Sequence, residues 1–251
     1  MTSFAVRLTF HGDLPFFLRS RKRETERPLR ERTSVKDVIE ACGVPHTEVD
    51  LIVMSGKPIG FERVLAQHAV VDVYGIDSPR VTLFPENRLQ VREIRNFVAD
   101  GHLGKLVRDL RLLGIDVAYA RDAEDRQLVE VAVSQNRALL TRDRRLLMHS
   151  AVRHGYYLRS QNPFEQTAEV LRRFELGATI RPFSRCLRCN APLRPVAKAT
   201  VVDRLQPLTK IYYEQFRNCS GCGQIYWSGS HFDKLLDRIE KLRATIQSAQ
   251  T

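Results

Sequence analysis

The stretch FVADGHLGKLVRDLRLLGIDVAYA, residues 97–120, decides the fold at the centre of this chain. It opens with a short apolar run that ends at Asp100. Apolar side chains then recur three and four positions apart from Leu103 to Leu113, which predicts a helix with one apolar face. Gly114 marks the end of that helix, and IDVAYA indicates a second strand. Two strands joined by one helix predict a parallel pair.

The same alternation continues beyond this stretch. The helix DRQLVEVAVSQN is followed by the strand RALLT, the short helix RRLLMHS, the strand YYLRS and the long helix PFEQTAEVLRRFEL. Strands and helices that alternate over short links predict a parallel sheet covered by helices, in which ligands bind at the carboxyl ends of the strands.

The N-terminal part of the chain has a different pattern. FAVRLTF alternates like a strand, and VDLIVM and AVVDVYGI indicate two more. Between them SVKDVIEACGV predicts a helix with Ser34 as its N-cap and Asp37 at the third helical position. Strands around one helix, with a closing central strand, predict a small α+β domain of the β-grasp kind. We expect Cys42, on the apolar face of this helix, to be buried in its core.

Charge is spread unevenly along the 251 residues. Residues 1–85 hold 12 basic and 11 acidic side chains, residues 86–180 hold 16 and 13, and residues 181–251 hold 12 and 5, a net +7. Such a basic region favours a polyanionic partner, although a solvated basic face is the alternative. No apolar run is long enough to span a membrane, and MTSFAVRLTF lacks the pattern of a signal peptide, so we expect a cytoplasmic location.

Three aspartates follow strands or open helices in the alternating segment. Asp100 follows FVA, Asp125 opens the helix after IDVAYA, and Asp143 ends RALLT and opens the next helix. Carboxylates gathered at one edge of a parallel sheet would repel each other unless a cation such as Mg²⁺ or Mn²⁺ bound between them. An aspartate at a helix start is also a common N-cap, so capping remains the alternative for Asp125 and Asp143 taken singly.

Four cysteines form two CxxC pairs near the C-terminus, with 29 residues between the pairs: Cys186, Cys189, Cys219 and Cys222. Two such knuckles, the second followed by Gly223, predict a zinc ribbon. We expect the zinc to be structural, because a complete Cys₄ shell leaves no open coordination position.

Three residues that follow the second knuckle, Tyr226, Trp227 and His231, each allow two interpretations. Tyr226 and Trp227 either pack a small core or stack on unpaired bases. His231 either belongs to a helix start or contacts RNA or the active site.

The segments FVADGHLGKLVRDLRLLGIDVAYA and LLTRD, with the aspartate that opens the helix between them, resemble the Mut-seven C-terminal ribonuclease domain, a branch of the PIN-like nucleases. The likeness covers about residues 95–180 and continues into the zinc module, where YWSGSH before a helix matches the same family. It implies metal-dependent cleavage of RNA, with Asp100, Asp125 and Asp143 as the acids that match the PIN pattern. The resemblance does not show whether the substrate is tRNA, rRNA or mRNA, or whether cleavage is endonucleolytic or exonucleolytic.

Many PIN-like nucleases carry a further acid, which Asp109 or Glu124 could supply here. Asp109 would serve equally well as a solvent-facing helix residue. The basic side chains near the acids could neutralise phosphates or could be ordinary surface charges: Lys105, Arg108, Arg142, Arg144 and Arg145.

The N-terminal part resembles the ubiquitin-like sulfur-carrier proteins in SVKDVIEACGVPHTEVDLIVMSGKPIGF and VVDVYGI. Those carriers end in a free Gly-Gly tail, whereas here the last strand is followed by Ile76-Asp77-Ser78-Pro79 and another domain. We therefore expect this domain to dock a protein partner rather than to carry sulfur.

The sequence thus predicts a metal-dependent ribonuclease whose basic zinc ribbon helps to bind RNA. A non-catalytic RNA- or ribosome-binding protein, or an adaptor that docks partners through the β-grasp domain, is the alternative. The expected parts are a β-grasp domain (1–78), a linker (79–93), a PIN-like parallel-sheet α/β domain (94–180), and a zinc ribbon with a C-terminal helix (181–251).

Overall fold

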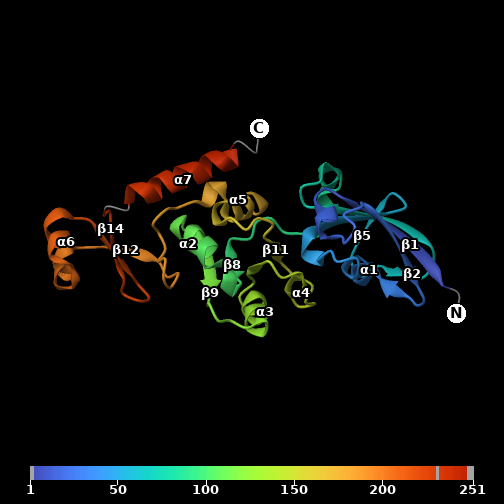
Figure 1. Ribbon diagram of the computed structural model, residues 1–251, viewed down its shortest axis with the longest axis horizontal. Coiled ribbons are helices and arrows are strands. Elements are labelled where there is room, and N and C mark those ends of the chain that lie inside the picture. The colour runs from blue at the N-terminus through green and yellow to red at the C-terminus, as the bar shows by residue number, and fades with distance from the viewer. Residues whose placement is uncertain (1–2, 230–231, 248–251) are drawn as a thin grey trace. The chain divides into compact units, whose positions relative to one another are not determined.

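The computed structural model describes residues 3–229 and 232–247 (Figure 1). The chain divides into two compact units, Met1–Val91 with Asp125–Tyr157 and Arg92–Glu124 with Leu158–Thr251. Each unit is described by itself. Among the described helices, none has the length and apolar character needed to cross a bilayer.

The first unit begins with a five-stranded sheet in the order β2-β1-β7-β4-β5, in which β1 and β7 are parallel and the other pairs antiparallel. A two-stranded antiparallel sheet joins β3 and β6. This arrangement confirms the β-grasp prediction. The strands are β1 (Phe4–His11), β2 (Glu24–Leu29), β3 (Thr33–Ser34), β4 (Val49–Met54), β5 (Lys57–Ile59), β6 (Val64–Leu65) and β7 (Ala69–Gly75).

Helix α1 (Val35–Ala41) begins where the sequence predicted. The Ser34 side chain accepts a hydrogen bond from the Asp37 amide, which satisfies one of the free N–H groups of the first turn. Val38 and Ile39 are buried in the core between the helix and the sheet. Cys42 follows the helix and packs against this core while only partly buried.

The polar run FFLRSRKRETERPLRER, which indicated no strand, contains β2. Its side chains are mostly exposed because β2 lies at one edge of the sheet. The antiparallel ladder with β1 stabilises it, from Phe4 opposite Leu29 to Thr9 opposite Glu24. A strand held by ladder bonds at a sheet edge needs little apolar character of its own.

The segment expected as a linker is held against the β-grasp domain. Asp50 on β4 is fully buried, and its carboxylate accepts hydrogen bonds from Arg88 Nε at 3.0 Å and from the Gln90 amide at 2.8 Å. The Gln90 side chain also donates to the carbonyls of His46 and Val49. The short 3₁₀ turns of this part of the chain are η1 (Leu14–Phe17), η2 (His46–Glu48), η3 (Pro79–Leu83) and η4 (Pro85–Asn87).

The rest of the first unit comprises α3 (Asp125–Ser134), β10 (Ala138–Thr141), α4 (Arg144–Leu147) and β11 (Gly155–Tyr157). Strands β10 and β11 pair in parallel, as predicted. The β-grasp domain holds this segment in place: His46 Nε2 lies 2.7 Å from the Val152 carbonyl, and buried Glu48 accepts a hydrogen bond from the Tyr157 amide at 2.7 Å.

The second unit contains the other parallel pair, β8 (Asn96–Ala99) and β9 (Asp116–Tyr119), joined by α2 (Gly104–Leu112). Helix α2 ends before Gly114, whose positive φ of 85° suits glycine, and a Cβ there would meet the Arg181 carbonyl oxygen. Helices α5 (Pro163–Arg173) and α7 (Phe232–Gln247) complete this part, and Figure 1 shows α7 running beside α5.

The C-terminal part of this unit forms a three-stranded antiparallel sheet in the order β12-β13-β14. The sequence IYYEQFRNC, residues 211–219, predicts one strand, and this prediction is partly wrong. Its first residues end a short helix that Pro207 begins, and only Phe216–Cys219 forms the strand. The elements of this part are β12 (Leu193–Val196), β13 (Phe216–Cys219), β14 (Ile225–Trp227), α6 (Pro207–Tyr212), η7 (Lys198–Thr200) and η8 (Val202–Arg204). Two further 3₁₀ turns lie earlier in the second unit, η5 (Gly101–Leu103) and η6 (Gly177–Thr179).

Candidate functional site

The two CxxC turns bring their four sulfur atoms together, all within 4.8 Å of one another. Cys186 Sγ lies 3.7 Å from Cys222 Sγ, and Cys189 Sγ lies 3.3 Å from Cys219 Sγ. A tetrahedral zinc ion with Zn–S bonds of about 2.3 Å places its sulfur ligands about 3.8 Å apart. The donor set and its spacing therefore fit a structural zinc ion, as the sequence predicted.

Hydrogen bonds prepare one of these thiols for metal binding. Burial raises the pKa of Cys186, but hydrogen bonds from Tyr226 and from the amides of Cys189 and Arg188 outweigh it and bring the pKa to about 6. The Leu187 amide donates to Tyr226 Oη at 3.1 Å, so the Tyr226 hydroxyl proton can point to Cys186 Sγ, also at 3.1 Å. Tyr226 therefore packs against the metal site, which favours the packing interpretation over base stacking.

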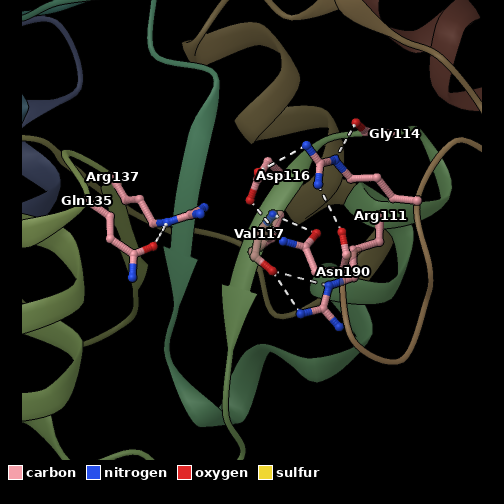
Figure 2. Close-up of polar contacts among 8 residues, drawn as sticks. Arg111, Gly114, Asp116, Val117, Gln135, Arg137 and Asn190 are labelled. Carbon is pink, nitrogen blue, oxygen red and sulfur yellow. Dashed lines mark hydrogen bonds and ion pairs between the residues drawn. The ribbon is translucent and has the colours of Figure 1, made fainter. Parts of the chain in front are cut away.

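The first knuckle is bonded directly to the strand β9 (Figure 2). Buried Arg111 donates through Nη2 to the Val117 carbonyl at 2.8 Å and through Nη1 to the carbonyls of Leu187 and Arg188, which lie between the two cysteines of that knuckle. Burial lowers the pKa of Arg111, although the Cys186 and Cys189 thiols oppose this shift. One guanidinium thus joins helix, strand and metal loop.

Asn190 supplies the second connection between the knuckle and β9. Its Oδ1 accepts a hydrogen bond from the Val117 amide at 3.2 Å, and its Nδ2 donates to Asp116 at 2.9 Å. Arg185 pairs with the other Asp116 oxygen at 3.0 Å and donates to the Gly114 carbonyl. Sequence reasoning missed this network, because nothing local marks Asn190 as the partner of β9, or Arg111 as a donor to the carbonyls of Leu187 and Arg188, which lie far from it in the chain.

Asp100 directly follows β8 in the second unit and is half-buried. The loop after β9 passes close beside it: a Cβ on Gly101 would lie 2.1 Å from the Arg121 carbonyl oxygen, and Tyr119 Oη donates to the Gly101 carbonyl at 2.7 Å. Gly101 is therefore required for a close approach of two backbones. The loop so placed carries the exposed Glu124.

Asp143 lies in the first unit as the N-cap of α4. Its Oδ1 accepts a hydrogen bond from the Arg145 amide at 2.7 Å, and its own amide donates to Thr141 Oγ1 at 2.9 Å. The side chain is exposed, and within the described part of the chain Oδ2 makes no hydrogen bond. The capping alternative is thus correct for Asp143, and it leaves one carboxylate oxygen open.

Asp125 is the first residue of α3 and is also exposed. It lines a cavity of about 630 Å³ together with Arg126, Arg145 and His149. Arg145 also lines a second cavity that contains Asp143. Within the first unit, Arg145 therefore lines both the cavity that contains Asp125 and the cavity that contains Asp143.

Asp109 is not a solvent-facing helix residue. It is only 7% exposed, and its Oδ1 accepts a hydrogen bond from Arg238 Nε on α7 at 2.9 Å. Thr167 on α5 donates to its other oxygen at 3.4 Å. The hydrogen bond and charge of Asp109 raise the pKa of Arg238. This pair joins α2 to α7.

The predicted substrate-binding side chains lie in different surroundings. Lys105 and Arg108 are exposed on α2, and Arg142 and Arg145 are exposed beside Asp143. Arg144 instead donates to the Phe17 carbonyl at 2.7 Å and stacks against aromatic rings, so it has a structural contact. Trp227 is 39% exposed at the end of β14, and His231 lies outside the described residues.

Fold and site together define a multidomain α/β protein with a four-cysteine cluster that fits a structural zinc ion. The family model described as the Mut7-C RNAse domain matches residues 95–239, and the one described as Mut7-C ubiquitin matches residues 3–80. Because the first match covers more than half of the chain, the chain belongs to the Mut7-C RNAse domain family, and it carries the Mut7-C ubiquitin domain before it. No curated protein and no solved structure matches the chain.

The family assignment confirms the resemblance drawn from the sequence. It indicates a ribonuclease function for the segment that contains the three aspartates and the cysteine cluster, and hence RNA as the substrate.

Proposed function

We propose that this chain hydrolyses phosphodiester bonds of RNA at a Mg²⁺ or Mn²⁺ site held by Asp100, Asp125 and Asp143, and that its basic zinc ribbon helps to hold the RNA. The Mut7-C RNAse domain supports the substrate and the reaction. Each of the three aspartates is exposed or half-buried and lies at a strand end or a helix start.

The open carboxylate oxygen of Asp143 is the observation that carries the proposal. A carboxylate that only caps a helix needs one oxygen for the N–H group, and here that oxygen is Oδ1. Oδ2 stays available as a hard oxygen ligand of the kind that Mg²⁺ and Mn²⁺ prefer. Asp143 also follows the parallel strand β10 at its carboxyl end, where ligands of parallel sheets bind.

A metal held there would supply an activated water molecule and would stabilise the charge on the leaving oxygen. The side chains of the chain have separate roles. Asp100, after β8, and Asp125, at the start of α3, would contribute further oxygen ligands to that metal. Arg142 and Arg145 are exposed beside Asp143 and neutralise the phosphate groups on either side of the scissile bond.

The zinc ribbon offers a second surface for RNA. A cavity of about 520 Å³ lies between its sheet and α7, lined by Phe183, Arg217 and Trp227 among others. Aromatic faces beside arginines bind unpaired bases and their phosphates. The indole of Trp227 is partly exposed there, whereas Tyr226 is committed to Cys186.

Cleavage of RNA by the purified chain with Mn²⁺ tests the proposal, and Asp143→Asn is the decisive variant. Asparagine is as good an N-cap as aspartate, so α4 should keep its cap while the charged ligand is lost. We expect the cleavage rate to fall roughly 100-fold or more, with an unchanged circular dichroism spectrum and retained RNA binding.

Asp77→Asn is the matched control, because Asp77 is an exposed aspartate outside the proposed site. It should cleave at the wild-type rate. A wild-type chain that binds RNA at low salt but cleaves none of a pool of structured and single-stranded RNAs with either metal would overturn the proposal in favour of a non-catalytic RNA-binding protein.

A further inference from the structure

A cleft in the first unit lies between two walls. One wall belongs to the β-grasp domain, and the other to residues 142–157, which include Asp143. Its volume is about 830 Å³. Arg19, Arg27 and Cys42 belong to the first wall, and Asp143 and Arg145 to the second. The β-grasp domain therefore borders the same cavity as the proposed catalytic acid.

The charged side chains that line this cleft are predominantly basic. Five arginines face two carboxylates, those of Glu40 and Asp143, and one of these two is already engaged, since Glu40 lies 2.6 Å from His46 Nδ1. The arginines are Arg19, Arg27, Arg142, Arg144 and Arg145.

Four of these arginines are available for an anion. Arg19, Arg27, Arg142 and Arg145 are exposed, and within the described residues none of the four forms an ion pair. Unpaired cations that converge on a concave surface favour an anionic ligand, because the field of each adds to that of the others. The positive charge of the cleft therefore exceeds its negative charge, and an anionic ligand would balance it.

The fifth arginine fixes the two walls to each other. Arg144 donates to the Phe17 carbonyl of the β-grasp domain at 2.7 Å, and its guanidinium lies 5.2 Å from the Phe17 ring centre and 5.8 Å from that of Tyr157. The Tyr157 amide is bonded in turn to Glu48. These contacts connect the two walls before a ligand binds, which lowers the entropy that binding would cost.

Positive charge also continues outward from the cleft along the β-grasp domain. The segment RSRKR, residues 19–23, has four basic side chains in five positions, all exposed. Arg21 lies over the ring of Phe16 at 5.9 Å. A track of cations that leads into a cleft matches a chain of phosphates rather than one isolated phosphate.

We propose that the β-grasp domain forms one wall of the RNA-binding cleft, and that Arg19 and Arg27 bind phosphates of a single strand whose scissile bond lies at Asp143. This inference rests on the proposed function. A cavity of about 830 Å³ is of the size that holds one or two nucleotides and is too small for a duplex. The apolar residues Phe17 and Leu18 in its wall are buried, so the exposed lining offers little to an apolar peptide.

Binding of a fluorescein-labelled single-stranded oligouridylate tests the inference by fluorescence anisotropy. The full chain carries Asp143→Asn in every variant to prevent cleavage. We expect Arg19→Ala with Arg27→Ala to raise the Kd roughly tenfold. The slope of log Kd against log salt concentration should also fall by about 0.7 for each phosphate that the variant no longer binds.

Arg30→Ala with Arg63→Ala is the matched control. It removes the same charge from exposed positions of the same domain, and neither residue lines the cleft. It should change the Kd less than twofold. Equal losses of affinity in the two double variants, or no loss in either, overturn the inference, and binding of an acidic peptide in place of RNA does so as well.

Single-turnover cleavage by the chain without Asp143→Asn separates the inference from the proposed function. With saturating enzyme the Arg19→Ala, Arg27→Ala chain should cleave at the wild-type rate, and below saturation roughly tenfold more slowly. If the wild-type chain cleaves and this variant matches it at every concentration, the inference fails while the function stands. If no chain cleaves and the difference in binding persists, the function fails while the RNA site stands.

Discussion

Two parallel strands of this molecule, β11 and β9, each have an amide that donates a hydrogen bond to a side chain of another domain. On β11 the amide of Tyr157 is bonded to buried Glu48 of the β-grasp domain at 2.7 Å. On β9 the amide of Val117 is bonded to Asn190 of the zinc ribbon at 3.2 Å. In both cases a side chain accepts a hydrogen bond from a strand amide, in the place that a further strand would fill.

The two attachments differ in what they depend on. Glu48 belongs to a domain with its own apolar core, so its position needs no metal. Asn190 follows Cys189 directly, and Arg111 bonds carbonyls inside the same knuckle, so their positions depend on a loop that the cysteine cluster shapes. We therefore expect metal loss to weaken the contact with β9 and to leave the contact with β11 intact.

The largest expected effect on this difference comes from Cys219→Ser. Losing one thiolate should abolish zinc binding, and in small zinc domains metal binding contributes on the order of 10 kcal/mol to folding. Zinc content should fall to nearly zero, and hydrogen exchange should rise at the Val117 amide and not at the Tyr157 amide. Cys42→Ser, outside the cluster, should keep its zinc. Equal exchange changes at the two amides would contradict the comparison.

A smaller effect is expected for Arg111→Met, which keeps the aliphatic stem and removes the guanidinium. The carbonyls of Val117, Leu187 and Arg188 then lose a charged donor, which should lower the free energy of unfolding by about 3 kcal/mol. Urea unfolding of the zinc-loaded chain measures it.

The same substitution in the Cys219→Ser background completes a double-mutant cycle. It should cost clearly less there, because the two knuckle carbonyls are no longer held in place. Full additivity of the two substitutions would show that Arg111 stabilises β9 independently of the metal.

The smallest of the three effects is expected for Glu48→Ala. It leaves the Tyr157 amide without its acceptor and should lower the free energy of unfolding by about 2 kcal/mol, by the same amount with zinc and after its removal. Glu48→Gln keeps an acceptor oxygen and should cost less than the alanine variant. If the loss of unfolding free energy in Glu48→Ala depended on zinc, the contact with β11 would not differ from the contact with β9 in its need for the metal.

Local patterns in the sequence predicted most of the elements that build both units. Ser34 three residues before Asp37 predicted the start of α1, and the alternation around 97–120 predicted β8, α2 and β9. The edge strand β2 was not predicted, because its partner β1 supplies the ladder bonds and its own side chains are polar. The first residues of IYYEQFRNC were assigned to the wrong element, since their β propensity is strong and Pro207 begins a helix there.

The residues of the candidate sites also separate into those that local sequence predicts and those whose role depends on partners distant in the chain. The chemistry of four cysteines at CxxC spacing is local, so the metal centre was predictable from the sequence, as was the capping role of Asp143. The pairing of Asp109 with Arg238 was not, because its partner lies on α7 and only packing of three helices excludes water from the pair.

By itself, the sequence determined the family, the order of helices and strands, the cysteine ligands and the three acids of the proposed site, because each depends on residue types at short fixed spacings. Only the tertiary structure decided that Arg111 and Asn190 bind β9, that Glu48 binds β11, and that Arg19 and Arg27 border the cleft of Asp143. Apart from Arg111 and Val117, which lie in neighbouring elements, these partners lie far apart in the chain. Which groups meet depends on how the elements pack against one another, because buried polar groups must find hydrogen-bond partners within the folded chain, and spacing along the sequence does not specify those partners.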